Sequence, residues 1–316
     1  MFARILTQNP NRLSLAQCLF FLAALGVFFS FTSPYFLSVS NINNILTASA
    51  VIGLIAVGAT FVIASGHIDL SSAAVMALCG TVCAWGLQKG EWSPWIALPV
   101  SVSLGGVCGL VTGFLITLTK APSFIVSLGM MSIARAAAYI VSHGMPIYGL
   151  PDNVITGGQG AIASVPVPVL LLLTGIFLGW VLLTQTKFGL HALILGDSVF
   201  AAEATGISAN RVRLKVFGVA GLYSGMAGVL FMLRTNAGDP TAGQSYELIA
   251  ITAVILGGAN LFGGRATIIG TMLGVLCLGV LQNGLNLLAV STYYQILFVG
   301  MVLLAAAFLS RVGYRR

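Results

Sequence analysis

Charge is what this sequence has least of. Only 7% of its 316 residues are charged, whereas 58% are hydrophobic and the mean hydropathy is +1.02. A soluble domain carries about 25% charged residues, because its water-facing surface must be covered by polar groups. The shortage excludes a soluble globule, a secreted disulfide scaffold, a coiled coil and a disordered tail. We therefore expect an all-α membrane protein, with the bilayer as its solvent.

Catalytic machinery is missing as well. The sequence has no G-x-x-x-x-G-K-[ST] phosphate-binding loop, no H-E-x-x-H pair and no G-x-S-x-G set with a triad. The histidines are scattered, and only His67 and Asp69, two residues apart, are close enough to predict a hydrogen bond. We expect a chain that is not an enzyme and binds no metal and no cofactor.

The five cysteines lie inside apolar runs and lack neighbouring metal ligands. We interpret them as small hydrophobic residues of the core. They are Cys18, Cys79, Cys83, Cys108 and Cys277.

Long apolar segments dominate the remainder of the chain. A spanning helix needs about 20 mainly apolar residues, and Asn41, Asn43 and Asn44 are expected to cap the second span. The eighth span is short and ends on Gly257-Gly258, so a re-entrant helix is an alternative to a full crossing there. About ten transmembrane helices are predicted, at residues 14–32, 44–65, 71–88, 95–118, 123–143, 165–185, 214–233, 247–262, 266–287 and 293–311.

Lysine and arginine predict the orientation of these spans. With a cytoplasmic N-terminus, only Lys89 and Arg234 fall on the outer side, as the positive-inside rule favours. Both termini are then cytoplasmic, and residues 1–316 form one transmembrane domain. The longest outer loop, 144–164, is either a plain connecting loop or holds a short surface helix or docking site, and the longest cytoplasmic segment is 186–213. The basic residues assigned to the cytoplasm are Arg4, Arg12, Lys120, Lys187, Arg211, Arg213, Lys215, Arg265, Arg311, Arg315 and Arg316.

The same distribution accounts for the net charge of +7, and we expect no nucleic-acid partner. The basic residues lie between apolar segments and form no basic face.

Small residues repeat every four positions on three spans, which predicts close helix–helix contacts. These residues are Gly105, Gly109 and Gly113, Gly221 and Gly225, and Gly270 and Gly274.

Polar residues within the spans are candidates for a solute pathway. Arg135 is either a gate or pathway residue, or a buried arginine satisfied by backbone carbonyls. Neutral amides and hydroxyls suit a hydroxyl-rich solute, although they also serve interhelical hydrogen bonds. The neutral candidates are Gln282, Asn283, Asn286, Tyr293 and Ser127.

The cytoplasmic segment predicts a short alanine-rich helix, with Asp197 as its N-cap and Gly206 as its stop. Such a helix either docks on a partner or simply bridges two spans. Its predicted contact residues are Asp197, Ala201, Ala202, Glu203, Ala204, Gly206 and Ile207.

Nearly end to end, the chain resembles the permeases of bacterial ABC importers for ribose, xylose, galactose and related sugars. One departure is His67, where relatives more often have glycine. The stretches that carry the resemblance are 55–58 (IAVG), 66–71 (GHIDLS), 122–129 (PSFIVSLG), 203–207 (EATGI), 240–243 (PTAG), 246–248 (YEL), 255–258 (ILGG), 261–264 (LFGG) and 281–288 (LQNGLNLL).

The resemblance implies a type II importer permease of about ten helices in the bacterial inner membrane, surrounded by lipid. It implies a second permease subunit, identical or different, two ATP-binding-cassette subunits that hydrolyse ATP, and a soluble sugar-binding protein outside. It also implies that the helix around residues 201–207 is the coupling helix that contacts the ATPase. The alternatives are an ABC permease for a branched-chain amino acid or nucleoside, or a secondary carrier.

Overall fold

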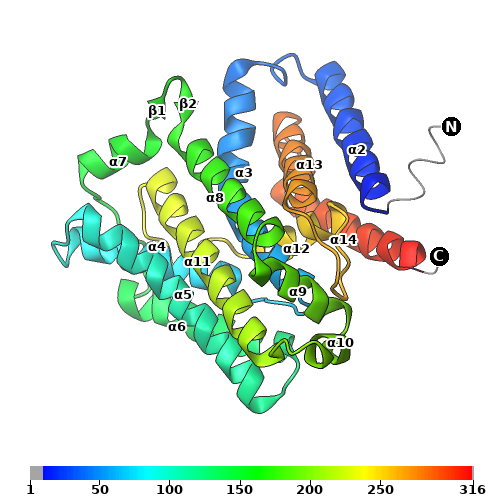
Figure 1. The fold of residues 1–316 in the computed structure, drawn as a ribbon. Helices are drawn as coiled ribbons and strands as arrows, with labels where there is room; N and C mark the ends of the chain where they lie inside the picture. The colour runs from blue at the N-terminus through cyan, green and yellow to red at the C-terminus, as the bar shows by residue number, and fades with distance from the viewer. Residues whose placement is uncertain (1–9, 315–316) are drawn as a thin grey trace.

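The computed structural model describes residues 10–314, and its regular secondary structure is helical apart from one small hairpin (Figure 1). Arg4, Arg315 and Arg316, which the orientation uses, lie outside this range. The helices are α2 (Pro10–Thr32), α3 (Val39–Ala64), α4 (Ser72–Gln88), α5 (Pro94–Thr119), α6 (Ser123–Ser142), α7 (Asp152–Gln159), α8 (Val167–Thr184), α9 (Lys187–Asp197), α10 (Val199–Ala204), α11 (Ala209–Thr235), α12 (Tyr246–Leu256), α13 (Ile268–Leu287) and α14 (Thr292–Tyr314).

Every predicted span contains a helix, but the helices differ in length. Among the described residues, seven helices are long and apolar enough to cross a membrane, whereas α4, α12 and the described part of α14 are shorter. α12 has 11 residues, or about 16 Å, which is about half of the hydrocarbon thickness. It ends at Leu256, where Gly258 takes a positive φ of 94°. The eighth span is therefore a broken helix that still crosses the bundle. Gly238, before α12, pairs with Ile147 of the predicted outer loop, whereas Gly263, after it, lies against Gly66 and Gly196 at the opposite end, so the re-entrant alternative is not supported.

Glycines bring the long helices into close contact, as the four-residue spacing predicts. A Cβ atom at Gly105 would collide with the carbonyl of Gly221, and one at Gly109 with the carbonyl of Phe217, so α5 lies directly against α11. Gly270 and Gly257 are in the same relation between α13 and α12. These contacts pack one helix backbone directly on another. Helices in a bilayer gain nothing by burying leucine, because lipid tails are equally apolar, and so they associate through close contacts of small residues.

Two helices form the buried centre of the bundle. α3 and α11 are mostly buried, whereas α2 and α6 are mostly exposed at its edges. Phe61, Val57 and Phe217 are wholly or almost wholly buried in this core. α2 is attached by a smaller cluster in which Phe29 and Phe36 pack with Ile45.

The predicted outer loop, 144–164, contains the surface helix α7, and it leads into a hairpin of β1 (Ala161–Ile162) and β2 (Val165–Pro166). The strands are antiparallel, with Ile162 opposite Val165. Figure 1 shows α7 and the hairpin at one end of the bundle and α9 and α10 at the opposite end. The segment predicted to be cytoplasmic, 186–213, thus lies on the side away from the predicted outer loop.

Candidate functional site

The short helix α10 begins with a serine cap. Ser198 is extended, with a φ of −158°, and its hydroxyl accepts a hydrogen bond from the Ala201 N–H at 3.2 Å. The prediction that Asp197 is the N-cap is wrong, because Asp197 is still helical and ends α9. The segment therefore folds as two helices with Ser198 between them.

Gly206 stops α10 as predicted. Its φ is +79°, and the Gly206 and Ile207 N–H groups donate to the carbonyls of Glu203 and Ala202 at 3.0 and 2.9 Å. Ala202 is wholly buried and anchors the helix, whereas Ala201, Glu203 and Ala204 are exposed. Phe200, which the sequence reasoning did not single out, is 84% exposed. Val199, beside it, is 43% exposed, so the two residues give this short, capped helix an apolar patch that is a candidate contact surface.

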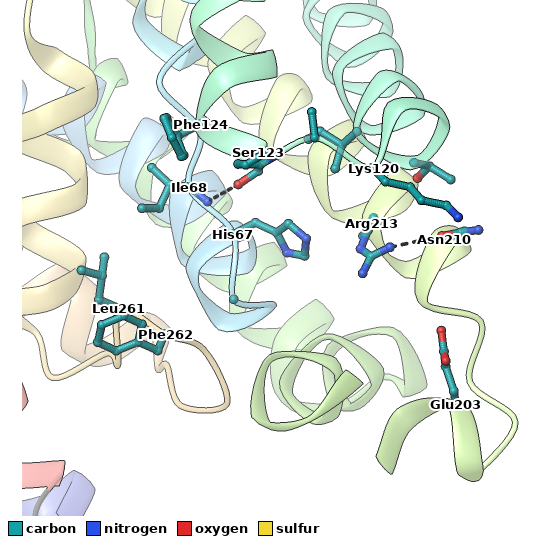
Figure 2. A pocket seen from close by; sticks show the side chains of 15 residues that line it. His67, Ile68, Lys120, Ser123, Phe124, Glu203, Asn210, Arg213, Leu261 and Phe262 are labelled. Carbon is teal, nitrogen blue, oxygen red and sulfur yellow. Dashed lines mark hydrogen bonds between the residues drawn. The ribbon is translucent and has the colours of Figure 1, made fainter. Parts of the chain in front are cut away.

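A cavity of about 830 Å³ lies beside α10, between it and the ends of α5, α6 and α11 (Figure 2). Lys120, Arg213 and Glu203 bring charge to its wall, and the His67 ring points into it. The Arg213 guanidinium donates to Asn210 Oδ1 at 3.2 Å, while its Nε is buried without an acceptor in the described part of the chain. The cavity is thus lined by two basic side chains, Lys120 at the end of α5 and Arg213 on α11, and by one carboxylate, Glu203 on α10.

His67 is neutral in this cavity. Its Nδ1 lies 2.8 Å from the Ser65 carbonyl oxygen, and its ring meets the Phe217 ring edge-on. Burial, followed by the nearby charge of Arg213, lowers the pKa of His67 from 6.5 to about 4. The predicted bond to Asp69 does not form, because the Asp69 carboxylate accepts from Ser71 instead.

The lowered pKa of His67 predicts acid sensitivity. As the pH falls below 6.5, the unfolded chain binds a proton at this position and the folded chain does not until the pH nears 4. Stability is therefore lost over this window, by up to about 1.4 kcal/mol per pH unit, and is unaffected above it. We expect the melting temperature of the solubilised permease to fall less between pH 7 and pH 5 in His67→Gln than in the wild type. Equal falls would show that His67 is not the group responsible.

Residues 65–71, between α3 and α4, are held by the first turns of α6. Ser123 and Ser127 accept hydrogen bonds from the backbone N–H groups of Ile68 and Leu70, at 3.0 and 3.1 Å. Within the segment, Asp69 accepts from both the N–H and the hydroxyl of Ser71, at 2.8 and 2.6 Å. Ser127 is completely buried in this role and faces no open space in the isolated chain.

Residues 236–245, between α11 and α12, repeat this arrangement. Asp239 accepts from the N–H and the hydroxyl of Thr241, at 2.8 and 2.7 Å. α6 again provides the support, because Arg135 donates to the carbonyls of Pro240 and Ala242, at 2.6 and 3.0 Å. Of the two interpretations of Arg135, these contacts support an arginine satisfied by backbone carbonyls. α6 thus holds two non-helical segments that enter from opposite ends of the bundle.

The amide candidates on α13 bond to other helices. Asn283 and Asn41 exchange two amide hydrogen bonds of 2.9 Å, and Gln295 donates to Asn286 at 2.7 Å. Tyr293 is 85% exposed, and Gln282 is half-buried. Asn41 is not a helix cap, because α3 begins earlier and Ser38 caps it. These residues lie together near one end of α13, away from Ser127 and Arg135 on α6.

The Asn41–Asn283 pair predicts a coupled loss of stability. In Asn283→Leu the Asn41 amide loses its two bonds to Asn283 and keeps the one from its Nδ2 to the Phe36 carbonyl, at an expected cost of about 1 kcal/mol. The double variant Asn41→Leu/Asn283→Leu is expected to lose less stability than the two single variants added together, because both single variants already break the same Asn41–Asn283 bonds. Thermal unfolding in detergent measures the cycle, and purely additive losses would contradict the coupling.

Long apolar helices, two non-helical segments held inside the bundle and an exposed, capped helix at one end together define a multi-pass membrane permease. The chain belongs to the family described as "Branched-chain amino acid transport system / permease component", which matches residues 41–307. No solved structure gives a significant match.

Three relatives are similar over nearly their whole length. The ribose import permease protein of Bacillus subtilis is 41% identical over 289 residues, 91% of this chain and 89% of the relative. The L-arabinose ABC transporter permease protein of Azospirillum brasilense is 37% identical over 91% of this chain and 84% of its own. The D-allose transport system permease protein of Escherichia coli is 34% identical over 93% of this chain and 90% of its own.

Proposed function

We propose that this chain is the membrane-spanning subunit of an ABC importer that moves a monosaccharide into the cytoplasm. The observation that carries the proposal is the full-length similarity to permeases named for ribose, arabinose and allose, at 34–41% identity. The family's description names branched-chain amino acids, whereas these three relatives are named for sugars.

ATP hydrolysis belongs to a separate subunit in this proposal, and α10 is the coupling helix that meets it. Exposed Phe200 and Glu203 on α10 form the contact, and buried Ala202 transmits force to the bundle. The proposed complex has a second permease subunit, two ATP-binding-cassette subunits and a soluble sugar-binding protein. It lies in the bacterial cytoplasmic membrane with both termini of this chain inside, as the positive-inside rule favours.

Affinity purification of the tagged permease from native membranes in mild detergent tests the proposal. We expect an ATP-hydrolysing subunit to co-elute, and its activity to rise when binding protein loaded with ribose, arabinose or allose is added. A permease that elutes alone and still moves solute into vesicles without ATP would instead support a secondary carrier. Stimulation by a branched-chain amino acid and by none of the sugars would support the amino-acid alternative.

A further inference from the structure

Residues 236–245 descend from the outer end of the bundle along α4. Gly238, near the start of this segment, touches Ala84, and Gly243 touches Met76 further along the same helix. Met76 precedes Gln88, the end of α4, by twelve residues, which is about 18 Å along the axis. The segment therefore reaches about half-way through the hydrocarbon core without being helical.

The buried side of this segment packs well. Ala242 and Gly243 are buried, and the carbonyl of Ala242 is bonded by Arg135. The position of Arg135 on α6 gives the same depth. It is twelve residues after Ser123, where α6 begins, which again is about 18 Å along the helix axis. Backbone that is not helical survives at this depth only where protein buries it or where it lines a water-filled cavity.

The other side of the segment is polar and open. Thr241, Gln244 and Ser245 are exposed in the chain, and Glu247 is half-buried in the first turn of α12. Hydroxyl, amide and carboxylate groups facing lipid tails at mid-membrane would lose their hydrogen bonds to water at a cost of several kcal/mol. This side must therefore face water or a polar partner rather than lipid.

Ser245 shows that the segment is held in an unusual conformation. Its φ is +69°, in the left-handed region, and within the described residues its side chain makes no capping bond at the start of α12. Strained backbone of this kind persists only where its surroundings enforce it, and it clusters at ligand sites. Here the hydrogen bonds from Thr241 to Asp239 and from Arg135 to the Pro240 carbonyl hold the segment in this conformation, on the side opposite the exposed residues.

We propose that Thr241, Gln244, Ser245 and Glu247 form one wall of the solute pathway and bind the hydroxyl groups of a neutral, hydroxyl-rich solute. The proposal rests on the sugar-importer function above, and it assigns the solute contacts to this segment. The Gln244 amide and the Ser245 hydroxyl both donate and accept. The Thr241 hydroxyl accepts, because its proton is donated to Asp239, and the Glu247 carboxylate accepts strongly, so the set matches the mixed donors and acceptors of a sugar. Arg135 and Asp239 are positioning residues, because they hold the wall and do not face the solute.

Water access to the wall is tested by thiol labelling, which needs no knowledge of the solute. Ser245→Cys in the full permease in membrane vesicles is expected to react with a water-soluble maleimide, because thiolate forms only where water reaches it. Phe177→Cys is the matched control, since Phe177 is 61% exposed on the apolar surface of α8 and should remain unreactive. A thiol at position 245 as inert as the one at position 177 would overturn the proposal.

Solute binding is tested by uptake in proteoliposomes that contain the complete importer, with ribose, arabinose and allose as probes. Gln244→Leu is expected to lower uptake about tenfold, the effect of one unpaired hydrogen-bonding group, while ATPase co-elution is unchanged. Gln88→Leu, an exposed amide at the outer end of α4, is expected to leave uptake intact. Unchanged uptake in Gln244→Leu would overturn the proposal that this segment binds the solute. Loss of ATPase co-elution from the wild type, with normal labelling at position 245, would overturn only the importer function.

Discussion

Gly109→Val is expected to prevent the folded permease from accumulating in the membrane. A Cβ atom at this position would collide with the carbonyl of Phe217 on the facing helix, and the valine methyl groups would add to the collision. The obstacle is backbone and cannot rotate away, so α5 and α11 would have to separate. That contact is central, because α11 also packs against α3 and α4.

Accumulation is measured as a monodisperse peak in size-exclusion chromatography of the solubilised, fluorescently tagged chain. Gly129→Ala is the matched control, since a Cβ atom at Gly129 meets none of the described residues within 4 Å. It is expected to fold as well as the wild type, because alanine favours the helix by about 1 kcal/mol over glycine. A normal peak from Gly109→Val would show that α5 and α11 are not in the contact described.

Glu203→Arg is expected to abolish sugar uptake and sugar-stimulated ATP hydrolysis while leaving the folded permease intact. Glu203 is exposed on α10 beside a cavity already lined by Lys120 and Arg213. A partner surface that binds the Glu203 carboxylate would itself be basic, and a third positive charge would repel it. Like charges facing each other at an interface cost several kcal/mol. The change lies on the surface, so it should not disturb the buried anchor Ala202.

The matched control for this variant is Glu91→Arg, an equal charge reversal at an exposed residue between α4 and α5. That position lies on the predicted outer side, away from the proposed ATPase, and uptake should remain near the wild-type rate. If both reversals reduced uptake equally, the effect would reflect net charge. If Glu203→Arg transported normally, α10 would not be the coupling helix.

Hydropathy was sufficient to predict where the helices lie, because each long apolar segment has one stable form in lipid. It was not sufficient to predict their ends. Ser38 and Ser198 cap helices for which Asn41, Asn43, Asn44 and Asp197 were the expected caps. All of these residue types are good caps, and the choice depends on which backbone leaves the helical conformation.

The candidate site was harder to predict for a related reason. Gln244 and Ser245 lie in a short polar stretch between two apolar segments, which looks like an ordinary surface turn. Only the contacts of Gly243 with Met76 and of Arg135 with Ala242 place that stretch deep in the bundle. Asn283 and Asn286, by contrast, are conspicuous in the sequence because an apolar helix surrounds them, yet both bond to other helices.

α11 connects the two ends of the molecule mechanically. It runs unbroken for 27 residues, about 40 Å, and contains no proline at which to bend. It begins five residues after α10 ends at Ala204, and it ends at Thr235, next to the segment that carries Thr241 and Gln244. A displacement of α10 would therefore tilt α11 as a rigid body about its glycine contact with α5. The opposite end of α11 would then move the proposed solute-facing wall.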